Sequence, residues 1–177
     1  MDQVAATQAV RSIFLAEGGL HGCAETAFMV LKARYGLPDP ADSAAAMALN
    51  GGLAYSGGPC GAVTGAALAI GLLAARRLPD HQEAKLMARG AVAALLDDFE
   101  TEFGAVDCRS LTGVDLRAPG GHDAFLASGA WRTACLRQLE FVVGRVGPLA
   151  DDLGRDRRAR PAEPAADPRI GPAGEGR

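Results

Sequence analysis

The amino-acid sequence predicts an all-α fold, a compact bundle of about five to seven helices. Apolar residues recur at helical spacing between short joints rich in glycine and proline, and no alternating strand pattern of useful length occurs. Alanine and glycine are abundant while aromatic residues make up only 5% of the chain, which favours helices packed closely through small side chains. Because 49% of the 177 residues are hydrophobic, the chain can bury one sizeable core as a single domain.

Glycine, proline and polar caps divide the first half of the chain into four predicted helices. The first spans about residues 3–17 and the second about residues 22–35, each followed by a glycine that can adopt a left-handed cap. A short third helix, about residues 43–49, ends at an asparagine followed by two glycines. The fourth is expected over residues 59–78, because a proline in the first turn lacks an N–H group that would be unpaired there.

The second half of the chain is expected to add three helices. Asp80 caps a long helix that extends to about Phe103, with a glutamate three residues after the cap. The stretch DCRSLTG, residues 107–113, is read as one or two helical turns. A loop follows over residues 114–123, and the last helix is expected over about residues 128–146.

The composition changes at Asp151. Residues 151–177 are rich in proline, glycine and arginine and nearly devoid of apolar side chains, so they are predicted to form a disordered tail. Residues 1–150 are then the helical domain that carries all four cysteines.

The charge and hydropathy of the chain exclude several classes of partner. A net charge of -3 gives no electrostatic case for nucleic acid or an anionic membrane. The longest apolar stretch, residues 60–75, is shorter than the roughly 20 residues that a spanning helix needs, so no membrane span is expected. Met1-Asp2-Gln3 lacks the features of a secretory signal, which favours the cytoplasm, where thiols stay reduced.

Three of the four cysteines are predicted to begin helices: Cys23, Cys60 and Cys108, whereas Cys135 falls inside the last helix. The first turn of a helix has unpaired N–H groups and a positive dipole end, which favour a thiolate. Cys60 is expected to be the most reactive thiol, because a glycine-rich loop leaves it accessible at a helix start.

The spacing of the cysteines means that any shared site must be assembled by tertiary packing. No C-x-x-C motif occurs, so the sequence encodes neither a zinc ribbon nor a thioredoxin motif locally. Gly58, Gly61 and Gly65 surround Cys60 and would let a cofactor or another backbone approach closely. Gly61 and Gly65 also form a strip of small residues, where the second or the last helix is expected to pack and bring its own cysteine toward Cys60.

The cysteine pattern resembles a family of redox-active proteins named for the signature C, GCAxxG, C, C. The residues that carry the resemblance are Cys23 in HGCAE, Cys60 in CGAVTG, Cys108 in CRSLTGVD, and Cys135. The hexapeptide CGAVTG matches the family's C-G-A-x-x-G residue by residue, and the similarity spans about residues 20–144. One departure is Gly22, where relatives often carry asparagine.

The resemblance implies redox activity, with the four cysteines as catalytic or metal-binding residues that pass electrons through thiol–disulfide exchange or an iron–sulfur cluster. A similar domain occurs in split-Soret cytochromes, but this chain has no C-x-x-C-H motif, so no c-type haem is expected. Two alternatives stay open: the thiolates hold zinc without redox change, or the cysteines are inert in an interaction protein. The redox partner is not identified by the sequence, and the small-residue faces are compatible with a homodimer.

The remaining polar residues give weaker signals. His21 lies two residues before Cys23 and is read as an exposed loop histidine rather than a proton donor or ligand. His81 and His122 receive no role. Asp115 is expected to organise the turn that follows Gly113.

Overall fold

The computed structural model describes residues 1–17 and 19–151, and within them the all-α prediction is confirmed. The helices in chain order are α1 (Gln3–Phe14), α2 (Cys23–Tyr35), η1 (Ala44–Leu49), α3 (Gly61–Arg77), α4 (His81–Phe103), α5 (Cys108–Thr112), α6 (Gly121–Ser128), η2 (Trp131–Cys135) and α7 (Leu136–Val146). Among these residues the one β-type pairing is an isolated bridge between Pro59 and Asp107.

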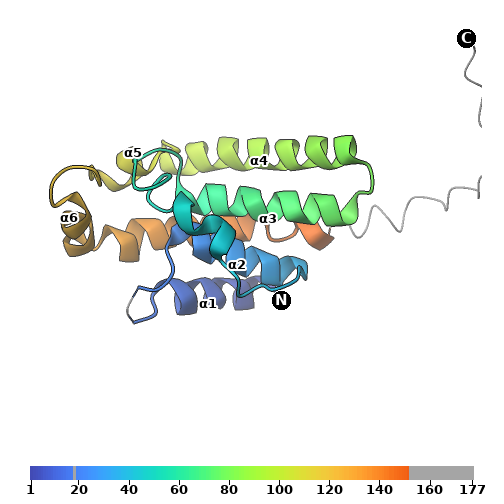
Figure 1. Cartoon of the computed structure of the whole chain (residues 1–177), viewed down its shortest axis with the longest axis horizontal. Helices are drawn as coiled ribbons and strands as arrows, with labels where there is room; N and C mark the ends of the chain where they lie inside the picture. The colour runs from blue at the N-terminus through green and yellow to red at the C-terminus, as the bar shows by residue number, and fades with distance from the viewer. Residues whose placement is uncertain (18, 152–177) are drawn as a thin grey trace, which may run out of the picture.

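The helices form an elongated bundle whose chain direction places several helix starts at one end. Figure 1 shows α1 and α4 running toward the end that carries α5 and α6, whereas α2, α3 and α7 run away from that end. Because three of the cysteines stand at the starts of α2, α3 and α5, this topology brings their segments to the same end of the molecule.

Helix α2 is the centre of the bundle. It packs against α1, η1, α3 and α7, and nearly all of its side chains are buried, as is typical of a helix enclosed on every side. Two of these buried side chains, Glu25 and Lys32, are charged. Lys32 is 4% exposed, and its Nζ donates to the carbonyl oxygens of Asp39 and Asp42 at 2.7 and 2.6 Å. These bonds satisfy the buried ammonium and fix the loop that leads from α2 to η1.

Helices α2 and α3 make the most extensive contact between two helices in the described part of the fold, and two glycines of α3 permit a close approach. A Cβ atom added at Gly65 would overlap the carbonyl oxygen of Ala24, and one added at Gly61 would overlap the Sγ atom of Cys23. Of the two helices expected to pack on this strip, it is the second that does so, and it carries Cys23 to the residue that follows Cys60.

Several helix ends differ from the sequence prediction for local reasons. The first helix ends at Phe14 instead of residue 17. The fourth begins at Gly61 instead of Pro59, because Pro59 is held in the extended bridge and Cys60 is the N-cap. The short third element is a 3₁₀ helix.

The segment before the last helix was predicted wrongly. The stretch expected to be a loop and then a single helix from residue 128 contains a separate helix, α6, which ends at Ser128. Gly120 and Gly129, at φ +73° and +69°, adopt the left-handed conformation at its two ends. The chain then forms a π-helical turn, Trp131–Cys135, before α7 begins. Cys135 thus lies at the junction of two helical segments instead of inside a regular helix.

The tail predicted for residues 151–177 lies outside the described residues, except for Asp151. The carboxylate of Asp151 pairs with Arg34 at 3.1 Å, at the C-terminal side of α7. Within the described part of the chain, no helix is both long enough and apolar enough to cross a membrane.

The α2–α3 contact can be tested with two glycines of the same helix. Gly65→Ala should lower the free energy of unfolding by about 1–3 kcal/mol, because the added methyl group meets the Ala24 backbone. Gly71→Ala is the control: a Cβ there has no neighbour within 4 Å, so the change should raise stability by about 0.5–1 kcal/mol. Urea denaturation followed by circular dichroism measures both, and equal stability of the two variants would contradict the contact.

Candidate functional site

Backbone hydrogen bonds join the segments that carry Cys60 and Cys108. The N–H of Cys60 donates to the carbonyl of Val106 at 2.8 Å, and the N–H of Cys108 donates to the carbonyl of Gly58 at 2.7 Å. These two bonds flank the Pro59–Asp107 bridge, so the starts of α3 and α5 are held side by side.

The other two cysteines join this region from α2 and η2. The Sγ of Cys23 lies against Gly61, the residue that follows Cys60. Burial raises the pKa of Cys135 most, and charge on Cys23, Cys60 or Cys108 raises it further, which indicates that these three thiols lie near it. Tertiary packing therefore brings segments from four distant parts of the chain together, as the spacing of the cysteines requires.

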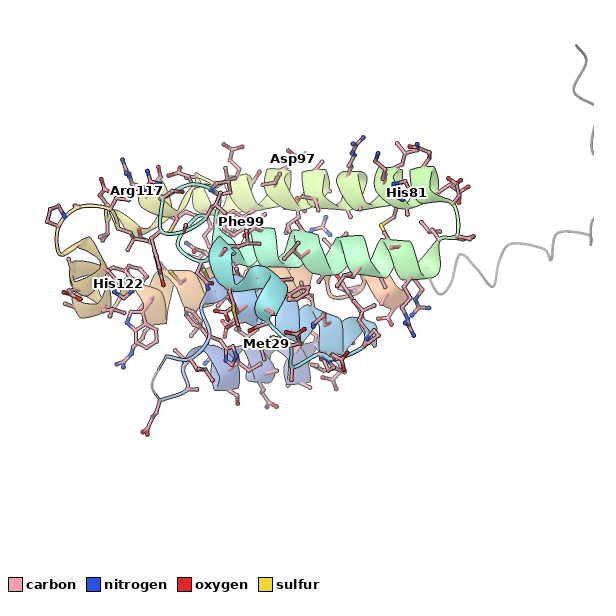
Figure 2. All side chains as sticks on the ribbon, viewed as in Figure 1. Met29, His81, Asp97, Phe99, Arg117 and His122 are labelled. Carbon is pink, nitrogen blue, oxygen red and sulfur yellow. The ribbon has the colours of Figure 1, made fainter. Side chains whose placement is uncertain are left out.

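A pocket of about 500 Å³ lies at this end of the bundle, and three of the cysteines, Cys23, Cys108 and Cys135, are among the residues that line it. His21, expected to be an exposed loop histidine, and His122, to which no role was assigned, also line it. Figure 2 shows His122 at the α6 end of the molecule, far from His81 at the start of α4. His81 thus remains without a role, whereas His122 joins the candidate site.

The start of α2 is capped by residues from other segments, which sequence reasoning missed. Oδ1 of Asn50 accepts hydrogen bonds from the Ala24 N–H at 2.9 Å and from the Cys23 thiol at 3.9 Å. The Asn50 side chain occupies the space that any side chain at Gly22 would need. An amide from a distant loop therefore stands beside Cys23.

Glu25 holds the Asn50 amide in place. Its carboxyl group is 7% exposed and accepts hydrogen bonds from the Gly22 N–H, the Asn50 side chain and the Ser43 hydroxyl at 2.8–2.9 Å. Glu25 therefore links three segments around Cys23.

The loop that carries Asn50 has an unusual backbone. Gly51, Gly52, Leu53, Ala54 and Tyr55 all have positive φ, between 48° and 74°. Left-handed conformations are costly for residues with a Cβ atom, so the surrounding contacts must hold this loop in place. It places Gly51 and Tyr55 in the pocket wall.

Cys60 is the most enclosed of the thiols at helix starts. It is 4% exposed, and its Sγ donates to Oε1 of Gln138 at 3.7 Å. Gln138 lies on α7 and is itself 3% exposed. Sequence reasoning could not find this partner, which lies 78 residues away.

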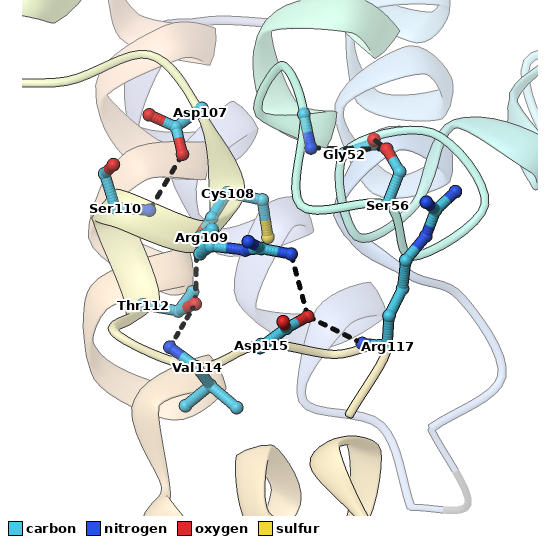
Figure 3. A network of polar contacts seen from close by, with 11 residues as sticks. Gly52, Ser56, Asp107, Cys108, Arg109, Ser110, Thr112, Val114, Asp115 and Arg117 are labelled. Carbon is cyan, nitrogen blue, oxygen red and sulfur yellow. Dashed lines mark hydrogen bonds and ion pairs between the residues drawn. The ribbon is translucent and has the colours of Figure 1, made fainter. Parts of the chain in front are cut away.

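Cys108 begins α5, which a network of polar contacts fixes in place (Figure 3). Asp107 caps the helix by accepting from the Ser110 N–H at 2.9 Å, and this bond is the main reason that its pKa is lowered. Asp115 accepts from the Arg117 N–H at 3.0 Å and pairs with Arg109 at 2.9 Å. Asp115 therefore organises the turn, as predicted.

The structure overturns the expectation that helix starts stabilise thiolates here. Burial raises the pKa of all four thiols above the usual 9.0, to about 12 for Cys60 and about 11 for Cys108. Backbone N–H groups at the helix starts oppose this effect at Cys23 and Cys60 but do not outweigh it. The thiols are therefore protonated at neutral pH.

Cys23, rather than Cys60, is the thiol best placed to react. It is half-buried where the other three cysteines are buried. Four backbone hydrogen bonds, involving Gly51, Ala24, Cys23 itself and Gly61, lower its pKa against the effect of burial. Charge on Cys23 raises the pKa of the other three thiols, so ionisation of Cys23 disfavours ionisation of the others.

The cysteines as placed do not form a metal site. In residues 1–17 and 19–151, no group of three or more histidine, cysteine, aspartate or glutamate side chains is arranged to hold a metal ion. The iron–sulfur cluster and the zinc site considered from the sequence therefore stay predictions.

The glycines proposed to bind a cofactor make close contacts within the protein. The Gly58 N–H donates to the Gly52 carbonyl, and the Gly58 carbonyl accepts from the Cys108 N–H. Helix α2 packs directly against Gly61 and Gly65. A cofactor role for these three glycines stays a prediction, and their contacts explain their small size without one.

Comparison with known families supports the resemblance. The sequence model of the family described as “Putative redox-active protein (C_GCAxxG_C_C)” matches residues 21–146, which include all four cysteines. No curated protein and no solved structure matches the chain.

The order of thiol reactivity is testable by alkylation. Iodoacetamide at about pH 8 should modify Cys23 before the other three, because Cys23 is the most exposed and four backbone hydrogen bonds favour its thiolate against the effect of burial. Mass spectrometry of tryptic peptides after timed quenching gives the four rates. Modification of Cys60 as fast as that of Cys23 would contradict this order.

The raised pKa values also predict how stability depends on pH. A folded thiol that holds its proton more tightly than the unfolded chain stabilises the fold below pH 9, and this contribution is lost as pH rises through about 11 and 12. The free energy of unfolding should fall above pH 9 by up to about 1.4 kcal/mol per pH unit for each thiol.

Cys60→Ala is the matched variant for this test. Denaturant unfolding between about pH 8 and 9.5 limits the contribution of Tyr35, whose pKa burial also raises from 10.0. The variant should lose stability less steeply than the parent protein. An equal slope would mean that the Cys60 pKa is not raised.

Proposed function

The chain belongs to the C_GCAxxG_C_C family, whose model matches residues 21–146, and on that basis we propose that it is a thiol-based redox protein. In this proposal Cys23 and Cys108 cycle between two thiols and a disulfide. Each sulfur loses one electron and one proton, the S–S bond forms, and an electron acceptor takes up the two electrons. Cys23 acts as the attacking thiol.

The observation that carries this proposal is the shared pocket wall of Cys23 and Cys108. After burial, charge on Cys23 is the largest factor that raises the pKa of Cys108, which supports their being neighbours. Cys60 is enclosed and engaged with Gln138, so its expected role is to pack behind the pair. Cys135 is the third cysteine that lines this pocket.

The proposal extends to partners and compartment. A pair that must return to the thiol state needs a reducing environment, which favours the cytoplasm. A net charge of -3 favours a redox partner that is not nucleic acid. The strip of small residues on α3, one basis for expecting a homodimer, is covered by α2 of the same chain.

The pairing can be tested by a redox titration. The protein is equilibrated with mixtures of reduced and oxidised dithiothreitol, free thiols are alkylated, and linked peptides are identified by mass spectrometry. A Cys23–Cys108 link should form, Cys23→Ser should abolish it, and Cys60→Ser should retain it. A different linked pair, or no reversible disulfide, would contradict the proposal.

Metal analysis of the purified protein separates the alternatives. A colourless, metal-free protein that forms the disulfide supports thiol chemistry. Brown protein with stoichiometric iron and sulfide would instead support a cluster, and colourless protein with stoichiometric zinc would support a zinc module.

A further inference from the structure

The pocket beside Cys23 and Cys108 has features that identify the class of molecule it accepts. We propose that it binds a neutral, planar and largely apolar quinone, which takes two electrons and two protons from these two cysteines. This inference rests on the proposed function, because it names the electron acceptor of the same thiol pair.

Size and access favour a small molecule over a protein disulfide. The pocket volume of about 500 Å³ is within the range typical of small-ligand sites. Cys108 and Cys135 are only 8% and 7% exposed. A cysteine on the surface of a folded partner would not reach these sulfurs, whereas a ligand that enters the pocket would.

Aromatic side chains supply the walls. Phe14 and Trp131 form an edge-to-face pair with ring centroids 6.0 Å apart, and Tyr55 forms another with His122 at 5.4 Å. Aromatic rings of this kind pack well against a flat conjugated ring. An acceptor as small as dioxygen or a peroxide would make little use of such walls.

The charges in the pocket favour a neutral ligand. Among the lining residues that the structure describes, Arg132 is the one lysine or arginine, and its guanidinium lies 4.5 Å from the centre of the Trp131 ring. Glu17 and Glu25 are the glutamates among these lining residues, and the Glu25 carboxyl group is already engaged by three donors. A phosphate-bearing nucleotide or flavin would find no cluster of cations here, whereas the histidines can donate to quinone carbonyl oxygens.

The chemistry of the thiols matches a quinone. Burial keeps the thiols protonated at neutral pH, so each releases a proton together with its electron. The S–H bonds of Cys23 and Cys108 break, the S–S bond forms, and the two carbonyl oxygens of the quinone become hydroxyl groups. Both sulfurs are oxidised and one quinone is reduced to one hydroquinone, so electrons and protons balance.

Binding can be measured with duroquinone, a quinone whose four ring positions are methylated so that thiols do not add to the ring. Trp131 is the only tryptophan of the chain and lines the pocket, so its fluorescence should be quenched saturably. The titration uses the full-length Cys23→Ser protein, which binds without electron transfer. Quenching that does not saturate would overturn the inference.

Two leucines with the same exposure provide a matched pair for the binding test. Leu126 lines the pocket and Leu72 lies on α3, and each is 47% exposed. In the Cys23→Ser background, Leu126→Arg should weaken duroquinone binding roughly tenfold, because it replaces an apolar wall with a charge. Leu72→Arg should leave binding unchanged, and an equal effect of the two substitutions would overturn the inference.

Electron transfer is measured with the reduced parent protein under nitrogen. One duroquinol should appear for each Cys23–Cys108 disulfide, as followed by absorbance and peptide mapping. If oxidised dithiothreitol forms this disulfide but duroquinone does not, the inference fails and the proposed function stands. If neither oxidant forms it, the proposed function itself fails.

Discussion

The contact between α2 and α3 at Gly61 and Gly65 is the constraint on which the arrangement of the site depends. Because neither residue has a side chain, the backbone of α2 rests directly on α3, and the Cys23 sulfur lies against the residue that follows Cys60. Two backbone hydrogen bonds, one on each side of the Pro59–Asp107 bridge, join the start of α3 to the start of α5. A larger side chain at either glycine would separate helices and sulfurs together, so the stability of the bundle and the geometry of the thiols share one cause.

Two opposing electrostatic effects act on the thiols, and burial is the larger. Helix starts supply N–H groups that favour thiolates, but these sulfurs lie among apolar side chains and beside one another, where each negative charge disfavours the next. The outcome is a set of protonated thiols, among which Cys23 is the most exposed. Such a site suits reactions in which electrons leave together with protons, and it is unlike sites where an isolated cysteine is kept ionised by a cation.

The polar groups around Cys23 come from separate segments and support one another. Asn50, which precedes five left-handed residues, caps α2. Glu25 accepts from the Asn50 amide and from the Ser43 hydroxyl. The unfavourable backbone of this loop is compensated by hydrogen bonds between its ends, such as those from Gly57 to Gly51 and from Gly58 to Gly52. Strain of this kind is common where a structure must hold particular side chains near a reactive group.

The sequence by itself determined the all-α class, the approximate positions of most helices, the cysteine-bearing helix starts and the strip of small residues that receives α2. These features depend on local pattern, such as apolar spacing, caps and the absence of side chains at Gly61 and Gly65. The tertiary structure alone decided the separate α6 helix, the π-turn at Cys135, the partners Asn50 and Gln138, and the direction of the thiol pKa shifts. The physical reason is that burial and hydrogen bonding of a sulfur are set by residues far away in the chain, whereas helix-start chemistry can be read from its immediate neighbours.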